Sequence, residues 1–203
     1  MNDPMQQPKQ KLILASSSPY RAAALERLGL TFSVHPAHVD ESPLANEPAH
    51  TLALRLAHAK AAAIAIEHPQ AVVIGSDQVG QCDGILLGKP GSVNAAVAQL
   101  SSLSGKTATF YTAVAIHHWA SEIQLGETVI TQVRFRRFCE DEARIYVELD
   151  HPIDCAGSFK AESLGICLFE EIQSADPTAL IGLPIIATLR HLRVCRINPL
   201  QPA

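Results

Sequence analysis

The pattern of apolar and polar positions along the chain alternates between runs typical of strands and spacings typical of helices. In the first part of the chain it predicts strands at residues 11–15, 32–35 and 71–74. It predicts helices at residues 19–28 and 51–68. Thr51 is expected to cap the second helix, and Pro69 to end it. The third strand is a buried valine and isoleucine run that stops at Gly75, which places Asp77 just past its end.

The rest of the pattern predicts a long hairpin and further helices. Two strands rich in threonine, valine and aromatic residues are expected at residues 107–117 and 127–136, and a short strand at 166–170. Helices are expected at residues 94–103, 140–149 and 184–192. We expect Gly126 to join the two long strands, and Gly84 and Gly88 to mark a loop before the first of these helices. Because strands and helices alternate, the predicted fold class is mixed α/β.

Asp77 is the first candidate for chemistry. An acid past the end of a buried strand lies at the edge where open α/β sheets bind ligands. The tetrapeptide at residues 75–78 adds a glycine hinge, a hydroxyl and an amide to this acid. A turn aspartate that bonds its own backbone is the alternative.

Length and composition indicate a globular protein with a substantial core. The chain has 203 residues, of which 47% are hydrophobic and 18% are charged. We expect residues 1–10 to form a disordered tail, neither a signal peptide nor a membrane anchor, and residues 11–203 to form a single domain. The longest apolar segment, residues 59–66, contains Lys60 and is far shorter than the roughly 20 residues of a membrane span.

Charge and cysteine content narrow the class of protein further. The formal net charge of −4 gives no broad basic field, so nucleic acid is not an expected partner. The five cysteines are odd in number and form no Cys-x-x-Cys pair, which argues against a disulfide framework and favours the reducing cytoplasm. His35, His38, His117 and His118 lack further ligands at metal-binding spacing, and we assign them no role.

The segment from Ser16 to Arg21 is the second candidate. A predicted strand leads directly into a helix, with Ser18 at the cap and Pro19 at the first helical position. Free backbone N–H groups at such a helix start attract anions, and Ser16 and Arg21 add a hydroxyl and a bidentate phosphate donor. Ordinary capping by serine is the alternative.

Acids and lysines in other segments add a third set of candidates. Asp40 and Glu41 follow a predicted strand in a loop, where they suit oxygen coordination of a divalent cation, although solvated loop acids are the alternative. Lys60 is in line with the apolar stripe of its helix, which indicates either a lysine that snorkels to solvent or an inward lysine that binds phosphate. Lys89 is a further basic residue, presented by a glycine-proline loop.

The loop from Cys155 to Ser163 is ambiguous by itself. It holds an aromatic residue between small ones, followed by Lys160 and Glu162 two positions apart. In an extended segment these two side chains project to the same side. An exposed connection with paired charges is the alternative, and the loop alone supports no role.

Taken together, these segments resemble the Maf-type nucleoside triphosphate pyrophosphatases over residues 12 to about 192. The shared motifs are Ser-x-Ser-Pro-x-Arg, Val-Asp-Glu, Arg-Leu-Ala-x-x-Lys-Ala, Gly-Ser-Asp-Gln, Gly-Lys-Pro and Gly-Ser-Phe-Lys, at residues 16–21, 39–41, 55–61, 75–78, 88–90 and 157–160. Tyr20, Gln78 and Glu162 make the chain most similar to the branch that hydrolyses 7-methyl-GTP. Members of that branch read Ser-Pro-Trp-Arg-Arg, so Tyr20 and Ala22 are departures that bear on affinity rather than on reaction class.

The resemblance implies an elongated, Maf/ITPase-like mixed sheet with helices, in two lobes around a central cleft, and a cytoplasmic homodimer. It implies a divalent cation, Mg²⁺ or Mn²⁺, bound by Glu41 and Asp77, with Asp77 as the catalytic residue. The residues implied to bind the substrate are Ser16, Ser18, Arg21, Lys60, Lys89 and Lys160. The implied reaction converts 7-methyl-GTP to 7-methyl-GMP and diphosphate, which removes modified nucleotides from the pool.

Three residues are implied to select the base. N7-methylguanine is cationic, so the ring of Tyr20 can attract it, while Glu162 accepts from its N1–H and exocyclic amine and Gln78 completes the pocket. The dTTP/UTP pyrophosphatase branch, the alternative within the family, carries arginine, threonine and glutamine at these positions, and this sequence matches none of them. A nucleotide-binding regulator of cell division is the alternative from another class, and only the enzyme needs Asp77.

Overall fold

The computed structural model describes residues 10–200. Its helices and strands are β1 (Leu12–Leu14), α1 (Pro19–Glu26), β2 (Ser33–Val34), α2 (Ala49–Glu67), β3 (Val72–Cys82), β4 (Ile85–Leu87), α3 (Val93–Leu103), β5 (Thr107–His118), η1 (Trp119–Ser121), β6 (Ile123–Phe135), α4 (Glu140–Asp150), η2 (Ala156–Ser158), η3 (Leu164–Leu168), β7 (Phe169–Ser174), η4 (Ala179–Ile181) and α5 (Ile185–Val194), where η marks a short 3-10 helix. The tail expected at residues 1–10 lies outside the described residues except for Gln10.

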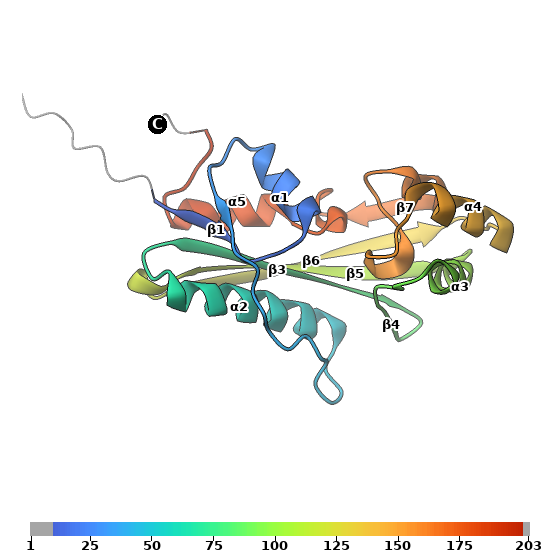
Figure 1. Cartoon of the computed structure of the whole chain (residues 1–203), viewed down its shortest axis with the longest axis horizontal. Coiled ribbons are helices and arrows are strands. Elements are labelled where there is room, and N and C mark those ends of the chain that lie inside the picture. The colour runs from blue at the N-terminus through green and yellow to red at the C-terminus, as the bar shows by residue number, and fades with distance from the viewer. Residues whose placement is uncertain (1–9, 201–203) are drawn as a thin grey trace, which may run out of the picture.

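One mixed seven-stranded sheet runs the length of the molecule (Figure 1). Its strand order is β2-β1-β3-β5-β6-β7, and β4 pairs with β3 beside this path. β1 pairs in parallel with β2 and β3, whereas the other pairs are antiparallel. Because β3, β5 and β6 have 11, 12 and 13 residues, the sheet is long, which confirms the predicted elongated α/β fold.

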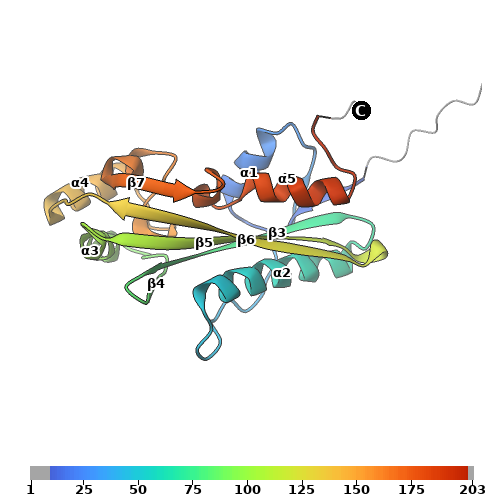
Figure 2. The same ribbon diagram turned by 180° about the vertical axis from the view of Figure 1, so that it is seen from behind.

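The helices divide between the two ends of this sheet. At one end α2 covers one face and α1 and α5 cover the other, while α3 and α4 lie at the opposite end, as the two opposite views show (Figures 1 and 2). The two ends are the two expected lobes. In the described part of the chain, no helix combines the length and the apolar character needed to cross a bilayer.

The prediction that a strand ends at Gly75 is wrong. β3 continues to Cys82, and Asp77 lies within it, opposite Ala113 of β5. A side chain at Gly75 would place its Cβ 2.2 Å from the carbonyl oxygen of Ala57 and 2.6 Å from the backbone nitrogen of Ala61. Gly75 is therefore the point where α2 packs directly on the strand, and not a hinge.

Other boundaries also differ from prediction. α2 begins after Pro48, so Thr51 lies inside the helix and does not cap it. Gly126 is within β6, and the hairpin turns at residues 119–122 instead. A Cβ at Gly126 would lie 2.3 Å from Nε2 of His58, so this glycine makes room for a side chain of α2.

The short strand expected at residues 166–170 begins later than predicted. Residues 164–168 form η3, and β7 starts at Phe169. A Cβ at Gly165 would lie 2.4 Å from the carbonyl oxygen of Lys160, so the chain turns back tightly there and cannot extend. The loop predicted around Gly84 and Gly88 contains the short strand β4.

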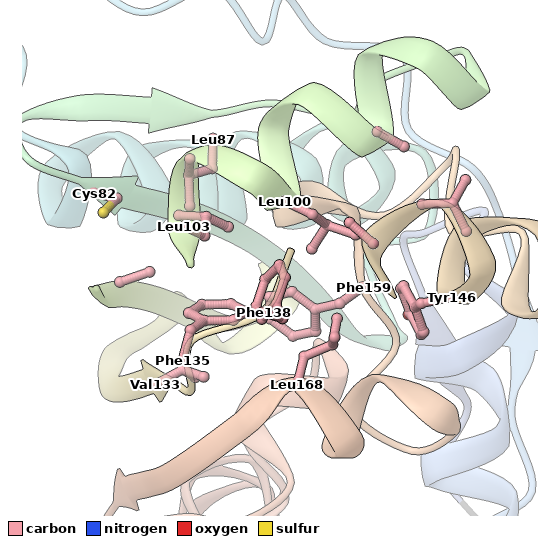
Figure 3. Packing of buried hydrophobic residues seen from close by; sticks show 14 of the residues in the cluster. Cys82, Leu87, Leu100, Leu103, Val133, Phe135, Phe138, Tyr146, Phe159 and Leu168 are labelled. Atoms are coloured by element: carbon pink, nitrogen blue, oxygen red, sulfur yellow. The ribbon is translucent and has the colours of Figure 1, made fainter. Parts of the chain in front are cut away.

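The core beneath α3 and α4 is built from aromatic and leucine side chains (Figure 3). Phe135 and Phe159 meet edge to face with ring centroids 5.7 Å apart, and Phe159 meets Phe110 in the same way at 5.2 Å. Phe159 is thus anchored in the core, which fixes the loop that leads to Lys160 and Glu162. The sequence motif at residues 157–160 therefore has a structural reason as well as a chemical one.

Candidate active site

A cavity of about 530 Å³ opens beside β3. Its walls come from α1, α2, β3, β4, the loop after α4 and η4. Every residue that the family resemblance implies for binding or catalysis lines it, namely Ser16, Ser18, Tyr20, Arg21, Glu41, Lys60, Asp77, Gln78, Lys89, Lys160 and Glu162. Segments that are distant along the chain thus supply one site.

The central ion cluster of the cavity consists of Lys60, Glu41 and Asp77. Lys60 Nζ lies 2.6 Å from Glu41 Oε1 and 2.7 Å from Asp77 Oδ1. Lys60 and Asp77 are only 7% and 8% exposed. Because a lysine that is buried to this extent needs a charged partner, the two carboxylates account for it, and it does not snorkel to solvent.

The electrostatic environment keeps Glu41 ionised. Partial burial opposes its charge, but the hydrogen bond and charge of Lys60, together with the charges of Lys89 and Arg21, lower the pKa of the Glu41 carboxyl below its usual value. Three cations therefore surround this acid. The same cations face any anion that enters the cavity.

The loop that carries Glu41 is clamped to α2. Arg55 donates to both carboxylate oxygens of Glu47, at 2.7 and 2.8 Å, and to the carbonyl oxygen of Ser42 at 3.0 Å. Hydrogen bonding to Arg55 lowers the pKa of Glu47 to about 2. Asp40, the other candidate acid of this loop, accepts from the backbone N–H of Ser42, so it closes a turn, and it does not line the cavity.

Arg21 links α1 to the opposite wall of the cavity. Its Nε donates to the carbonyl oxygen of Gly182 at 2.8 Å, and its Nη1 donates to Ser16 Oγ at 3.0 Å. Burial lowers the pKa of Arg21, and the nearby charges of Asp77 and Glu41 oppose that shift. Ser18 caps α1 as predicted, with its hydroxyl accepting from the Arg21 backbone at 3.5 Å.

The two remaining lysines differ in their contacts. Lys89 is exposed on the loop after β4, close enough to lower the pKa of Glu41. Lys160 Nζ donates at 2.7 Å to the carbonyl oxygen of Asp150, at the end of α4. Its ammonium therefore also stabilises a helix C-terminus.

A second cluster of residues in the cavity is mostly acidic and aromatic. Tyr20, Asp154, Cys155 and Glu162 line it together. Burial, followed by Cys155, Asp154 and Glu162, raises the pKa of the Tyr20 hydroxyl, so both acids lie near this hydroxyl. Burial and Asp154 raise the pKa of Cys155 to about 12, so this thiol stays protonated and is a poor nucleophile.

The two acids at the ion cluster suit a divalent cation. Oε1 of Glu41 and Oδ1 of Asp77 converge on one ammonium, so they are placed to share a positive charge, and carboxylate oxygens are the ligands that Mg²⁺ prefers. In residues 10–200 no cluster contains three or more histidine, cysteine, aspartate or glutamate side chains placed to hold a metal. Such a cation would complete its coordination with substrate oxygens and water.

Sequence reasoning missed several residues of the site. Asp154 lies next to a recognised motif, and an acid beside the loop that carries Glu162 was a usable signal. Thr112 and the Gly182 carbonyl gave no signal in the sequence, because their roles depend on partners far along the chain. Arg55 was noticed only as part of a family motif, and its clamp on Glu47 was not expected.

Comparisons with known proteins show which family the chain belongs to. Proteins named 7-methyl-GTP pyrophosphatase from Aromatoleum aromaticum and Idiomarina loihiensis are each 49% identical to this chain, over 90% and 94% of it and 94% and 97% of their own lengths. A protein with the same name from Albidiferax ferrireducens is 46% identical over 98% of this chain and 99% of its own length. The family described as Maf-like protein matches residues 11–195. The chain therefore belongs to the Maf family.

Proposed function

We propose that this chain is a nucleoside triphosphate pyrophosphatase that converts 7-methyl-GTP to 7-methyl-GMP and diphosphate. The observation that carries the proposal is the division of charge within one cavity. Arg21, Lys60 and Lys89 gather around Glu41, whereas Tyr20 lies with Asp154 and Glu162 in a second cluster. A triphosphate joined to a cationic base has the complementary distribution of charge. The names of the relatives give the same substrate.

The basic end of the cavity suits the triphosphate. Arg21, Lys60 and Lys89 supply positive charge, and the hydroxyls of Ser16 and Ser18 lie at the start of α1, where free N–H groups favour anions. Lys160 lines the same cavity and is a further cation for the phosphate chain. The phosphates would be positioned with the α-phosphorus next to Asp77.

We assign the divalent cation, Mg²⁺ or Mn²⁺, to Glu41 and Asp77. When bound, it would polarise the α-phosphoryl group and neutralise charge in the transition state. Both carboxylates are held in place by protein contacts: Lys60 bonds Asp77, and the clamp of Arg55 holds the loop of Glu41. The clamp thus serves the metal site indirectly.

Asp77 is the general base of the proposed reaction. Its Oδ1 accepts from Lys60, while Oδ2 has no donor in the described part of the chain and remains open to the cavity. Oδ2 takes a proton from water as the water oxygen attacks the α-phosphorus in line. The bond from phosphorus to the bridging oxygen breaks, diphosphate leaves, and the proton passes to solvent.

The acidic end suits the base. N7-methylguanine carries a positive charge, which the ring of Tyr20 attracts by cation–π contact and which Glu162 and Asp154 complement. Glu162 accepts from the N1–H and the exocyclic amine of the base. Tyrosine is a weaker platform for a cation than tryptophan, and the second acid offsets part of that difference.

The setting of the protein is part of the same proposal. All five cysteines are free thiols, in agreement with a reducing cytoplasm. We propose that the protein works there as a homodimer and clears modified nucleotides from the pool, as the family resemblance implies. Gel filtration with light scattering tests the dimer, and a molecular mass near that of one chain would contradict it.

A substrate panel tests the function directly. Purified protein with Mg²⁺ is offered 7-methyl-GTP, GTP, UTP and dTTP, and the release of diphosphate and of each monophosphate is measured. We expect the highest kcat/KM for 7-methyl-GTP, with one diphosphate per monophosphate. A preference for UTP or dTTP would move the protein to the other branch of the family, and nucleotide binding without turnover would make it a sensor.

A further inference from the structure

The wall of the cavity opposite the ion cluster is formed by η4 and Gly182. Leu180, Ile181 and Gly182 line the cavity. The Gly182 carbonyl oxygen accepts from Arg21 Nε at 2.8 Å and lies 3.1 Å from Ser76 Oγ, whose single hydrogen it shares with the Ala113 carbonyl oxygen at 2.8 Å. The wall is therefore fixed by side chains of β3 and α1.

Gln78 and Thr112 form further hydrogen bonds between the sheet and the same wall. They lie opposite each other in β3 and β5. Gln78 Nε2 lies 2.9 Å from Thr112 Oγ1 and 3.1 Å from the carbonyl oxygens of both Ala179 and Leu180. The fully buried hydroxyl of Thr112 donates to the Ala179 carbonyl oxygen at 2.9 Å.

These contacts leave only one orientation for the Gln78 amide. Carbonyl oxygens only accept, and the single hydroxyl hydrogen of Thr112 is already given to Ala179, so the group that faces all three must be the NH₂. The amide oxygen then faces the other way. No donor among residues 10–200 meets Gln78 Oε1, and this oxygen is not among the enclosed polar atoms, so it opens to the cavity.

We propose that Thr112 is a positioning residue for base recognition, because together with the carbonyl oxygens of η4 it holds Gln78 in the orientation that presents only an acceptor to the nucleotide. An acceptor favours a base edge that offers N–H groups. Glu162 takes the N1–H and one hydrogen of the exocyclic amine of 7-methylguanine, which leaves the second amine hydrogen for Gln78 Oε1, whereas adenine carries no amine at that position. The choice of 7-methyl-GTP as the preferred ligand rests on the proposed function, while the orientation of Gln78 rests on the contacts alone.

Equilibrium binding tests the proposal separately from turnover. Titration calorimetry compares 7-methyl-GTP with ATP on the Asp77→Asn background, where bound nucleotide is not hydrolysed. Thr112→Val removes the hydroxyl at nearly constant shape, and we expect the preference for 7-methyl-GTP over ATP to fall about tenfold. Thr112→Ser keeps the hydroxyl as the matched control, and we expect it to keep the preference.

A double-mutant cycle shows whether Thr112 acts through Gln78. Gln78→Met alone is expected to cause a similar loss of preference, and Thr112→Val added to it is expected to cause no further loss. Gln78 is partly exposed, so this variant tests the acceptor even where a change at Thr112 prevents folding.

The outcomes separate this inference from the proposed function. Equal losses for both nucleotides, additive effects in the cycle, or a Thr112→Ser variant as impaired as Thr112→Val would each overturn the positioning role. Absence of 7-methyl-GTP hydrolysis by the unaltered protein would overturn the proposed function. The binding preferences would still decide whether Thr112 controls the base.

Discussion

The proposed phosphate end and the proposed base end of the cavity are built in different ways. At the phosphate end, Lys60 and Asp77 come from the middle of a helix and of a central strand, and both are buried and bonded to each other. At the base end, Asp154 and Glu162 are exposed and lie on a loop. A buried ion cluster is preorganised for one chemistry, whereas an exposed loop can change without disturbing it. In the proposed function, this difference would allow the loop that reads the base to change while the chemistry at Asp77 stays the same.

The strongest test of this comparison is to remove the proposed general base, Asp77. We expect Asp77→Asn to lower kcat for 7-methyl-GTP about 10³-fold, because an amide cannot take the proton from water. Nucleotide binding should remain measurable by calorimetry, since Arg21 and Lys89 are unchanged. Asp83→Asn, on the turn after β3, is the matched control and should retain full activity. A variant at position 77 that still turns over at a tenth of the normal rate would exclude the assigned role.

Removing the shared cation tests the phosphate end in a second way. Lys60→Met leaves Glu41 and Asp77 facing each other without the ammonium that joins them. We expect kcat/KM to fall about 10²-fold for every triphosphate, because the lost charge serves the phosphates and not the base. The control is Lys106→Met, which breaks only the surface pair with Asp83. A loss confined to 7-methyl-GTP would contradict the division of labour.

The same contrast explains what could be predicted from the sequence. The helix starting at Pro19 and the inward Lys60 follow from local patterns, since a cap or a four-residue spacing is visible within one segment. The interpretation of Gly75 as a strand end is wrong. In the sequence alone, a glycine that lets a helix pack closely on a strand cannot be told from a glycine that forms a turn, because the helix is not seen next to it. Thr112 was invisible for the same reason: its partner in η4 is remote along the chain.

At the base end the expected effects are smaller and selective. Tyr20→Ala removes the ring that attracts the cationic base, and Glu162→Gln removes the charge that complements it. We expect each to lower kcat/KM for 7-methyl-GTP about tenfold while changing the values for UTP and dTTP by less than about twofold. Glu170→Gln removes an acid that pairs with Arg134, outside the cavity, and serves as the control. Equal losses on all substrates would show that these residues support the fold instead of reading the base.

The smallest expected effect lies outside the cavity, at a histidine pair. His58 Nδ1 of α2 lies 2.9 Å from His117 Nε2 of β5. Burial, followed by the charge of His58, lowers the pKa of His117 to about 4, and burial also lowers the pKa of His58. The unfolded chain therefore binds more protons than the folded one below about pH 6.5, and the free energy of unfolding falls as the pH drops toward 4.

A substitution in this pair can distinguish acid unfolding of the protein from acid inactivation of the active site. His117→Gln cannot be protonated, so we expect it to reduce the decline in unfolding free energy between pH 6.5 and 4 by about 1–2 kcal/mol. Urea titrations at several pH values measure the effect, and His151→Asn, at an exposed helix end, is the control that also removes one histidine. The ratio of kcat/KM for 7-methyl-GTP to that for UTP should not change at neutral pH, because neither histidine lines the cavity. A variant with the full acid sensitivity of the original chain would show that the pair does not carry this linkage.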